Sequence, residues 1–429
     1  MASPKRRVAI LGSTGSIGTQ ALQVIAAHPD RFEVVALAAG SNAPMLAEQV
    51  RATGATIVGI ADAAAASELA ALLRAPSASQ PDSASRPASA DQVEILTGVE
   101  AAVQIAGESG ADVVLNGMTG SIGLRPTLAA LRSGATLALA NKESLVVGGA
   151  LVAEAVQRPG QVVPVDSEHS ALAQALSSGR HERGLCSLPG PGQSALSGAS
   201  EVSKLVVTAS GGPFRGWDAA ALAGVTPAQA LKHPNYAMGR VVTTNSATMV
   251  NKALEVIEAH LLFDIGVEDI ATVVHPQQWI HSMVQFADGS TIAQAGHPRM
   301  LIPIALGLSW PDRLSEVDVP IDWTQAMQWD FEPLDEQAFP AVALAKQACA
   351  ASPTHMAVYN AANEQAVEAF HAGRLSFPGI VSTVEATLAR YSPAGSAGEL
   401  SLEEVLEAER WARAAADELI GAAKVQVHA

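Results

Sequence analysis

The sequence predicts an α/β protein in which a parallel β-sheet comes first, a second α/β segment follows, and a helical bundle ends the chain. Three observations carry this prediction. Short β-branched runs alternate with alanine- and leucine-rich segments in the first half, a glycine-rich turn follows the first run, and apolar residues near the C-terminus recur at helical spacing. Strands that alternate with helices of this length are typical of βαβ units and therefore of a parallel sheet.

The strands and helices of the first two segments follow from these runs. In the first half, strands are expected at residues 7–11, 32–38, 56–60, 93–97, 112–115, 136–140 and 161–165. The helical patterns between them include residues 20–27, 45–53, 125–133 and 144–157. In the second segment, we expect strands at 204–209, 272–274, 282–286 and 291–295, and a helix at 246–262.

The rest of the chain is predicted to be helical after a connector that contains Pro, Asp and Trp. Residues 340–350, 356–372, 380–391 and 402–420 show the i, i+3, i+4 apolar spacing of amphipathic helices. Two stretches break the pattern, namely 75–90, which reads APSASQPDSASRPASA, and 179–200, which is rich in Gly, Ser and Pro. We expect the first to be a disordered surface insertion and the second a passive loop, because such compositions bury little apolar surface.

Charge and cysteine content exclude several classes of function. The chain has 429 residues with 26 Lys and Arg against 42 Asp and Glu, which gives a formal net charge of −16. That balance argues against general binding to nucleic acid or to an anionic membrane. Cys186 and Cys349 cannot form a disulfide framework or a four-thiolate zinc site. No apolar run approaches the ~20 residues of a membrane span, so we expect a cytoplasmic protein.

A glycine-rich turn follows the first predicted strand and leads into a helix. It consists of Gly12, Ser13, Thr14, Gly15, Ser16, Ile17 and Gly18. The GxxGxxG spacing differs from the usual GxGxxG, but the glycines still permit a tight turn, and the helix N-terminus offers N–H groups to a pyrophosphate. The turn therefore predicts a Rossmann-like dinucleotide site, with a purely structural βα turn as the alternative.

The end of the second predicted strand bears on the choice of dinucleotide. NAD enzymes tend to carry Asp or Glu there, where the carboxylate binds the ribose 2′-hydroxyl. This chain has Gly40, Ser41 and Asn42 instead, without a carboxylate that would repel a 2′-phosphate. The sequence therefore favours NADP, although no arginine lies at this turn.

Two carboxylates at the end of the strand predicted at 161–165 are candidate metal ligands. Asp166 and Glu168 flank Ser167, and at i, i+2 on an extended segment they point the same way. Hard oxygen ligands of this kind suit Mg2+ or Mn2+. An exposed loop end or a helix N-cap is the alternative explanation for the same pattern.

A helix further along the chain offers a third carboxylate and several polar groups. Asn251 and Glu255 lie at i, i+4 and share a face, with Lys252 adjacent and Ser246 before them. Hydroxyl, amide and ammonium groups together suit a phosphate. A capped, solvated helix start would give the same local pattern.

Three further residues are candidates because of where they follow predicted strands or turns. Ser210 lies in TASGGP after a strand, and His233 lies in HPN. Lys142 follows the strand at 136–140, where an ammonium group can polarise a carbonyl. An ordinary polar helix start is the alternative for Lys142.

Several long motifs, taken in order, give the chain a resemblance to a known family. They are GSTGSIG at 12–18, ANKESLV at 140–146, DSEHSAL at 166–172, TASGGPF at 208–214, HPNYAMG at 233–239, NSATMVNKALE at 245–255, HPQQWIHSMV at 275–284 and NAANE at 360–364. Over about residues 7–420, the chain resembles the 1-deoxy-D-xylulose 5-phosphate reductoisomerase family.

The resemblance implies an organisation and a reaction. It implies a V-shaped homodimer with an NADPH-binding domain at 1–165, a catalytic domain that binds metal and substrate at 166–310 and carries a mobile flap, a connector at 311–335, and a helical domain at 336–429. The reaction would be the isomerisation and reduction of 1-deoxy-D-xylulose 5-phosphate to 2-C-methyl-D-erythritol 4-phosphate, in the non-mevalonate isoprenoid pathway. It would use NADPH and Mg2+, Mn2+ or Co2+. The carbon skeleton would rearrange by retro-aldol and aldol steps or by an α-ketol shift.

The resemblance also assigns roles to residues. It makes Asp166, Glu168 and Glu255 the metal ligands, and adds Lys142 and His233 to the catalytic group. Substrate contacts would come from Lys142, Ser167, Glu168, Ser210, His233, Ser246, Asn251, Lys252 and Glu255. Cofactor contacts would come from residues 12–18 and from Gly40, Ser41, Asn42, Asn141, Glu143 and Gly239.

The chain departs from the family pattern at several positions. Tyr236 stands where most members have Trp, and Asn245 where Asp is frequent. Ser41 stands where some members carry Lys, and Arg299 replaces a usual Asp after a proline. We expect Tyr236 to alter substrate affinity without abolishing activity. Two other interpretations are another NADP-dependent dehydrogenase and a non-catalytic nucleotide-sensing module on the same fold.

Overall fold

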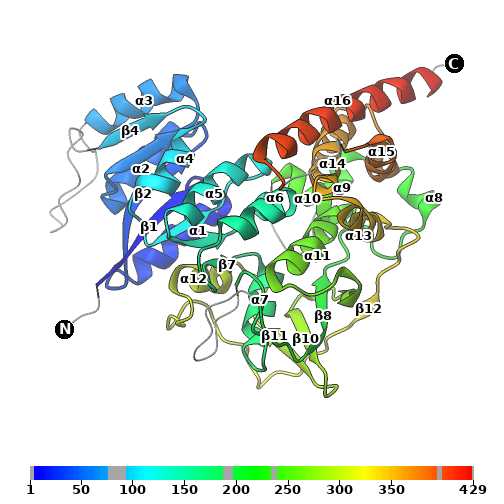
Figure 1. Cartoon of the computed structure of the whole chain (residues 1–429), viewed down its shortest axis with the longest axis horizontal. Coiled ribbons are helices and arrows are strands. Elements are labelled where there is room, and N and C mark those ends of the chain that lie inside the picture. Colours follow the sequence, from blue (N-terminus) through cyan, green and yellow to red (C-terminus); the bar gives the residue numbers. More distant parts are fainter. Residues whose placement is uncertain (1–3, 76–92, 187–196, 233–238, 394–398, 428–429) are drawn as a thin grey trace.

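The computed structural model of the protein describes residues 4–75, 93–186, 197–232, 239–393 and 399–427. It contains two β-sheets and a group of C-terminal helices, which occupy the left, lower and upper right parts of the view in Figure 1. The insertion predicted at 75–90 lies outside the described residues after Ala75. The middle of the loop predicted at 179–200 also lies outside them.

Seven parallel strands form the first sheet, in the order β4-β3-β2-β1-β5-β6-β7. They are β1 (Arg6–Leu11), β2 (Phe32–Ala39), β3 (Ile57–Ile60), β4 (Glu94–Thr97), β5 (Val113–Asn116), β6 (Thr136–Leu139) and β7 (Val162–Pro164). The predicted parallel α/β sheet is confirmed. The strand order reverses between β1 and β5, and at such a switch point the loops diverge and leave a crevice at the carboxyl edge of the sheet.

Helices cover both faces of this sheet. Along β1, Val8 and Ile10 belong to one apolar core and Ala9 and Leu11 to the other, because successive side chains of a strand point to opposite faces. The core around Val8 takes in α1 (Ser16–Ala27), α2 (Ala43–Thr53), α3 (Ala63–Arg74) and α12 (Leu301–Ser309). The core around Ala9 takes in α4 (Ala101–Glu108), α5 (Leu124–Arg132) and α6 (Lys142–Ala155).

The second sheet has five strands in the order β11-β10-β8-β9-β12. They are β8 (Val202–Ala209), β9 (Ile270–Val274), β10 (Ile280–Phe286), β11 (Thr291–Ala295) and β12 (Glu332–Pro333). Only the β8–β9 pair is parallel among the pairs of this sheet. The helices α7 (Ser167–Leu176) and α11 (Val250–Phe263) pack on it. Strand β12 lies in the segment predicted to be a connector without a strand.

The helix predicted at 246–262 is interrupted in the structure. Helix α10 (Arg240–Ala247) ends at Ala247, and α11 begins at Val250. Met249 separates them with a left-handed φ of +63°. The prediction of one continuous helix was wrong. Because of the break, Ser246 lies on α10 and Asn251 lies on α11.

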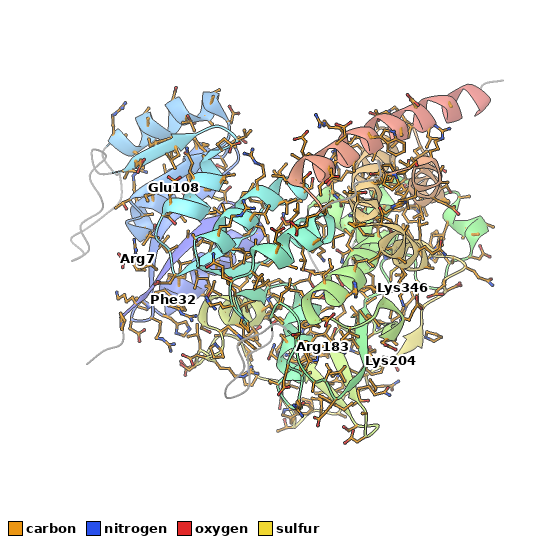
Figure 2. The ribbon with its side chains drawn as sticks, viewed as in Figure 1. Arg7, Phe32, Glu108, Arg183, Lys204 and Lys346 are labelled. Atoms are coloured by element: carbon orange, nitrogen blue, oxygen red, sulfur yellow. The ribbon has the colours of Figure 1, made fainter. Side chains whose placement is uncertain are left out.

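Three C-terminal helices pack around a fourth, α14, and the four agree with the predicted bundle. They are α13 (Ala341–Ala351), α14 (His355–His371), α15 (Phe377–Arg390) and α16 (Leu402–Val427). Lys346 of α13, labelled in Figure 2, donates to the backbone oxygen of Ile270 at the start of β9 (2.9 Å). Asn363 of α14 donates to Asn245 of α10 (2.9 Å). These contacts tie the bundle to the elements around the second sheet.

Two short helices, α8 (Ala219–Leu222) and α9 (Pro227–Ala230), lie between β8 and α10, and 3-10 turns occur at Ser121–Gly123 and Val267–Asp269. Among the residues that the structure describes, no helix combines the length and the apolar character needed to cross a membrane.

Candidate active site

A cavity of about 770 Å³ lies where the carboxyl edge of the first sheet meets α7 and α11. The loops after β1, β5 and β6 form one side of it, and the start of α7 and the side chains of α11 form the other. The predicted residues that line it are Gly15, Ser16, Ile17, Lys142, Glu143, Asp166, Ser167, Glu168, Ser210, Gly239, Ser246, Asn251, Lys252 and Glu255. One cavity therefore joins candidate cofactor residues to candidate metal and substrate residues.

The glycine-rich turn forms a backbone cradle at one end of the cavity. Gly12 has a φ of +77°, and a Cβ atom placed on it would lie 2.8 Å from the backbone oxygen of Gly117. Glycine is needed at this point because a side chain disfavours that φ and would strike the loop after β5. Helix α1 begins at Ser16, and its N-cap Gly15 provides no side-chain cap for the first N–H groups. This geometry suits the pyrophosphate of a dinucleotide.

Three cofactor candidates lie after β2, outside the cavity wall. Gly40 and Ser41 are exposed there. The Asn42 side chain accepts a hydrogen bond from Met45 N (3.2 Å) and so caps α2. These residues are accessible at the edge of the sheet, but the Asn42 carboxamide oxygen already has a structural partner.

Asn141 also has a structural role in the fold. It is fully buried, and its side chain accepts from Ser144 N (2.7 Å) as the N-cap of α6. Its amide nitrogen donates to the backbone oxygens of Met118 (2.5 Å) and Gly120 (2.8 Å). Asn141 therefore shapes the loop after β5, which borders the cavity. Glu143 follows in the first turn of α6, and burial raises the pKa of its carboxyl group.

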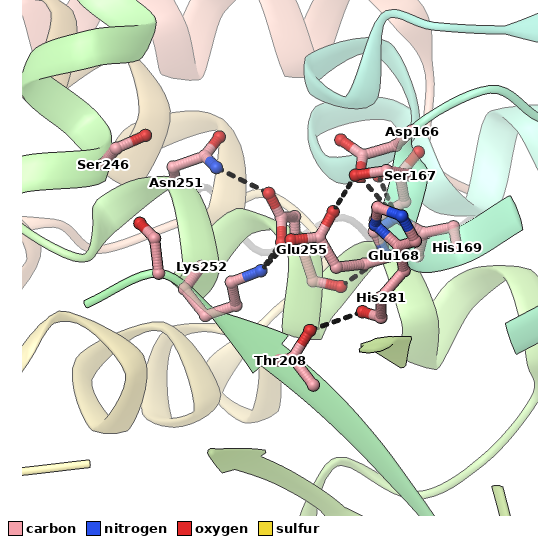
Figure 3. Close-up of polar contacts among 12 residues, drawn as sticks. Asp166, Ser167, Glu168, His169, Thr208, Ser246, Asn251, Lys252, Glu255 and His281 are labelled. Atoms are coloured by element: carbon pink, nitrogen blue, oxygen red, sulfur yellow. Dashed lines mark hydrogen bonds and ion pairs between the residues drawn. The ribbon is translucent and has the colours of Figure 1, made fainter. Parts of the chain in front are cut away.

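Three carboxylates from two helices meet at the other end of the cavity. Asp166 is the N-cap of α7, Glu168 lies in the first turn of α7, and Glu255 lies on α11. One oxygen of each lies within 4.8 Å of the others, and Figure 3 shows the three side chains converging. The prediction of an extended segment was wrong, because the chain turns into α7 directly after Asp166. The carboxylates meet through a helix start and not through strand alternation.

Two lysines lie between these carboxylates. Lys142 Nζ is 2.5 Å from Asp166 Oδ2 and 2.8 Å from Glu255 Oε1. Lys252 Nζ is 2.6 Å from Glu168 Oε1 and also pairs with Glu255. Burial acts to lower the pKa of Lys142, but Asp166 and Glu255 outweigh it and hold that pKa well above its ordinary value. Both lysines therefore act as internal counter-ions of the cluster.

The cluster has the composition and the charge that a divalent cation requires. Its three carboxylates outnumber the two ammonium groups, so the lysines do not offset all of the negative charge. Burial and the charge of Glu255 raise the pKa of Glu168. Carboxylate oxygens are the hard ligands that Mg2+ and Mn2+ prefer. Asp166, Glu168 and Glu255 therefore fit the cation that the sequence predicted.

Polar donors surround the carboxylates. Asn251 Nδ2 donates to Glu255 Oε1 (2.6 Å), and Asn251 Oδ1 accepts from Lys142 Nζ (3.0 Å). Ser246 lines the cavity from α10, and Ser210 lines it from the loop after β8. The structure thus brings the predicted phosphate-binding groups into one cavity, although they come from three separate elements.

The other substrate candidates are Ser167 and His233. Ser167 Oγ donates to Glu168 Oε2 (2.5 Å), which turns this hydroxyl towards the carboxylate cluster. His233 lies outside the described residues, as does Tyr236. Gly239 is the N-cap of α10 and lines the cavity.

Sequence reasoning missed two buried groups beside the cluster. His169 and Glu258 form a second set with Asp166, in which one ligand-type atom of each lies within 4.8 Å of the others. Burial acts to lower the pKa of His169, but Glu258 and Asp166 outweigh it and raise that pKa to about 9. Burial raises the pKa of Glu258. The available signal was the i+3 spacing of Glu258 from Glu255, which places both on one face of α11.

Other residues also line the cavity, but no sequence motif had predicted that they would contact a ligand. Met118 and Thr119 follow β5, and their place beside the turn after β1 follows from the reversal of strand order. Arg299 lies in the wall and pairs with Asp318 Oδ1 (3.0 Å). This ion pair accounts for the charge of Arg299 without involving the carboxylate cluster.

A dinucleotide cradle and an oxygen-ligand cluster in one cavity define a metal- and dinucleotide-dependent enzyme. Family models described as 1-deoxy-D-xylulose 5-phosphate reductoisomerase and as its C-terminal domains match residues 8–149, 162–263 and 295–415. The reductoisomerase of Pseudarthrobacter chlorophenolicus is 58% identical over 414 residues, which is 96% of this chain and 98% of that protein. The chain belongs to the 1-deoxy-D-xylulose 5-phosphate reductoisomerase family.

Further relatives agree in sequence and in fold. The reductoisomerase of Beutenbergia cavernae is 56% identical over 416 residues, which is 97% of each chain. The Zymomonas mobilis enzyme, solved in complex with NADPH, has a TM-score of 0.82 at 38% identity and covers 97% of this chain and 99% of its own. A reductoisomerase solved with NADPH, fosmidomycin and magnesium has a TM-score of 0.82 at 31% identity and covers 98% of this chain and 99% of its own.

Proposed function

We propose that this chain converts 1-deoxy-D-xylulose 5-phosphate to 2-C-methyl-D-erythritol 4-phosphate in isoprenoid biosynthesis, with NADPH and a divalent cation. The observation that carries the proposal is the single cavity that contains both the glycine cradle and the cluster of Asp166, Glu168 and Glu255. The relative solved with NADPH and magnesium supports this choice of cofactor and cation. The absence of a carboxylate after β2 also favours NADPH over NADH.

The cation is assigned to Asp166, Glu168 and Glu255. A cation held by these carboxylates would polarise the substrate carbonyl and stabilise the negative charge that develops on the substrate oxygens. Lys142 contacts Asp166 and Glu255, so its ammonium group orients both carboxylates. Lys142 also lines the cavity, and its ammonium group would donate to a substrate oxygen by giving up one of its present acceptors, Asp166, Glu255 or Asn251.

The substrate phosphate is assigned to Ser210, Ser246, Asn251 and Lys252. Two hydroxyls, an amide and an ammonium group provide donors that match phosphate oxygens. A phosphate held by these four groups would fix the orientation of the reacting carbons and so lower the entropic part of the barrier. NADPH supplies the hydride for the reduction, and the turn at residues 12–18 would hold its pyrophosphate.

A homodimer is part of the proposal. The connector carries exposed apolar side chains, including Val319, Trp323 (70% exposed) and Phe331, and Ile292 of β11 is also exposed. Apolar side chains that gather on a surface commonly mark a contact with another chain. Sedimentation equilibrium should give twice the chain mass of 44.0 kDa, and a monomer at micromolar concentration would contradict the dimer.

The domain boundaries and the location in the cell are also proposals. Limited proteolysis with mass spectrometry should cut within the largely exposed connector at 311–335 if the domains are those predicted at 1–165, 166–310 and 336–429. The boundary at residue 165 is buried and should resist cleavage. Cell fractionation should recover the protein with cytoplasmic markers. Cuts inside the seven-stranded sheet, or recovery with another fraction, would contradict these proposals.

The test of function follows the loss of NADPH absorbance with 1-deoxy-D-xylulose 5-phosphate. It uses Mn2+ or Mg2+, a chelator, the variant Glu255→Gln, and the exposed control Glu268→Gln. Metal-dependent oxidation that Glu255→Gln abolishes and Glu268→Gln preserves is the expected result. Metal-independent oxidation with a simple aldehyde phosphate would favour another dehydrogenase. NADPH binding without oxidation under any condition would favour a nucleotide-sensing module.

A further inference from the structure

Glu258 is a fully buried carboxylate without an obvious role in the proposed chemistry. Among the described residues, neither of its oxygens has a hydrogen-bond partner. It lies on α11, three residues after Glu255. A buried carboxylate without hydrogen bonds is costly unless a neighbouring charge compensates it. The group that faces it is the imidazole of His169, whose Nδ1 lies 3.2 Å from Glu258 Oε2.

The His169 ring contacts two of the residues assigned to the cation. Its Nδ1 lies 3.4 Å from Asp166 Oδ1. Its Nε2 lies 2.8 Å from the backbone oxygen of Glu255. The ring is fully buried, and Figure 3 shows it beside Asp166. His169 therefore touches one ligand residue through its side chain and another through its main chain.

These contacts connect two helices that supply the carboxylates. Helix α7 provides Glu168 and His169, with Asp166 at its N-cap, whereas α11 provides Glu255 and Glu258. The His169–Glu258 pair crosses from one helix to the other at the level of the cluster. Residues around a metal site that orient its ligands commonly control affinity for the metal.

We propose that Glu258 is a positioning residue that fixes the His169 ring and, through that ring, sets the orientation of Asp166 and the approach of α7 to Glu255. The inference rests on the proposed function, because it takes Asp166, Glu168 and Glu255 as the cation site. Without the negative charge of Glu258, the ring keeps its Nε2 contact but loses one of the two charged oxygens that face Nδ1. The carboxylate of Asp166 then loses a fixed neighbour, and the cation meets a less ordered site.

A competing explanation is that Asp166, His169 and Glu258 hold a second cation themselves. Their facing atoms lie close enough to share an ion. The two explanations differ in stoichiometry, because positioning requires one cation per chain and a second site requires two. The number of Mn2+ ions bound per chain distinguishes the two explanations, and its measurement does not depend on turnover.

The experiment measures Mn2+ binding to the full-length chain by electron paramagnetic resonance of free Mn2+. It compares the wild-type protein, Glu258→Gln, and the control Glu409→Gln. Glu409 is also a buried glutamate with an oxygen that lacks a hydrogen-bond partner among the described residues, but it lies on α16. We expect one Mn2+ per chain, bound ~10–100-fold more weakly by Glu258→Gln, with affinity unchanged in Glu409→Gln. NADPH affinity, measured by fluorescence, should stay within twofold in both variants.

A double-mutant cycle tests the path through His169. His169→Gln removes the nitrogen that faces Glu258, so a path through this ring predicts that the double variant binds Mn2+ about as weakly as either single variant. Multiplied losses in the double variant would overturn the proposal. So would a folded Glu258→Gln protein with wild-type Mn2+ affinity, or a second Mn2+ per chain that this substitution removes.

A second variant keeps the test decisive if Glu258→Gln does not fold. In that case His169→Gln alone decides, because wild-type Mn2+ affinity in that protein would overturn the proposal, and a ~10–100-fold loss would support it. Turnover by the wild-type protein is measured separately. A wild-type protein that binds Mn2+ but does not consume 1-deoxy-D-xylulose 5-phosphate would refute the proposed function and leave the positioning result standing.

Discussion

Replacing Gly12 with alanine should damage NADPH binding through a clash that the structure locates. A non-glycine residue at a φ near +77° costs ~1–2 kcal/mol. The new Cβ would lie 2.8 Å from the oxygen and 2.9 Å from the carbonyl carbon of Gly117, whereas ordinary contacts begin at 3.4 Å. Overpacking of this kind adds ~1–3 kcal/mol, so the free energy of unfolding should fall by about 2–5 kcal/mol.

The same substitution should weaken NADPH binding, because relief of the clash moves the turn away from the position proposed for the pyrophosphate. A loss of ~1.4–2.8 kcal/mol of contact corresponds to ~10–100-fold weaker binding. Gly54→Ala is the matched control, since Gly54 has a φ of +74° and a Cβ atom added there would have no neighbour within 4 Å. It should lose only the backbone part, ~1–2 kcal/mol, and keep its NADPH affinity.

Urea unfolding and titration with NADPH fluorescence measure both quantities on the full-length chain. The difference between the two variants isolates the close approach of Gly12 to Gly117 from the backbone conformation that both glycines share. Equal losses of stability in the two variants, together with wild-type NADPH affinity in Gly12→Ala, would refute the reasoning.

Three further results are expected. Asn363→Ala leaves the buried acceptor Asn245 Oδ1 unpaired, so urea unfolding should show a loss of ~1–3 kcal/mol, and a strictly additive loss on adding Asn245→Ala would contradict the pairing. Burial lowers the pKa of His181, so the unfolded chain binds a proton more readily than the native one, and stability should decrease as pH falls below ~6.5. His181→Asn should flatten that slope in urea unfolding at a series of pH values, and an unchanged slope would exclude His181 as its source. Lys252→Gln removes a counter-ion from buried carboxylates, so added Mn2+ should raise its Tm more than that of the wild-type protein; an equal or smaller rise would contradict this account.

The strands of the first sheet could be predicted from local signals. Each of them begins and ends within one residue of the predicted position, because β-branched runs between helical segments mark a parallel sheet directly. The packing of α12 on that sheet could not be predicted in the same way. The apolar run at 301–309 indicates only that a segment is buried, and its partner strands lie more than a hundred residues earlier in the chain.

The break between α10 and α11 shows a second limit of local reasoning. Met249 adopts a left-handed conformation without glycine or proline nearby, so the sequence carries no ordinary signal for the end of a helix. Thr248 Oγ1 donates to the backbone oxygen of Thr244 (3.2 Å), a contact that competes weakly with regular helix geometry. Only the tertiary structure shows that such a contact coincides with a break.

The sequence predicted which residues form the candidate site, but it did not predict the contacts between them. The motif resemblance selected Lys142, Asp166 and Glu255, which are separated along the chain but come together in the structure. No spacing rule connects them, since their proximity depends on how α6, α7 and α11 pack. The pair of His169 and Glu258 was missed for the same reason, because it forms only when α7 lies against α11.

The lysines of the cluster make cation binding an exchange rather than a simple addition. Lys252 Nζ contacts Glu168 and Glu255, so a divalent ion at the proposed site would compete with the ammonium group for the same oxygens. An anion that draws Lys252 towards itself releases the same oxygens. By thermodynamic linkage, the anion and the cation then increase each other's affinity by an equal factor. A shared lysine thereby makes the two occupancies interdependent, and the cavity favours holding both ligands over holding either one alone.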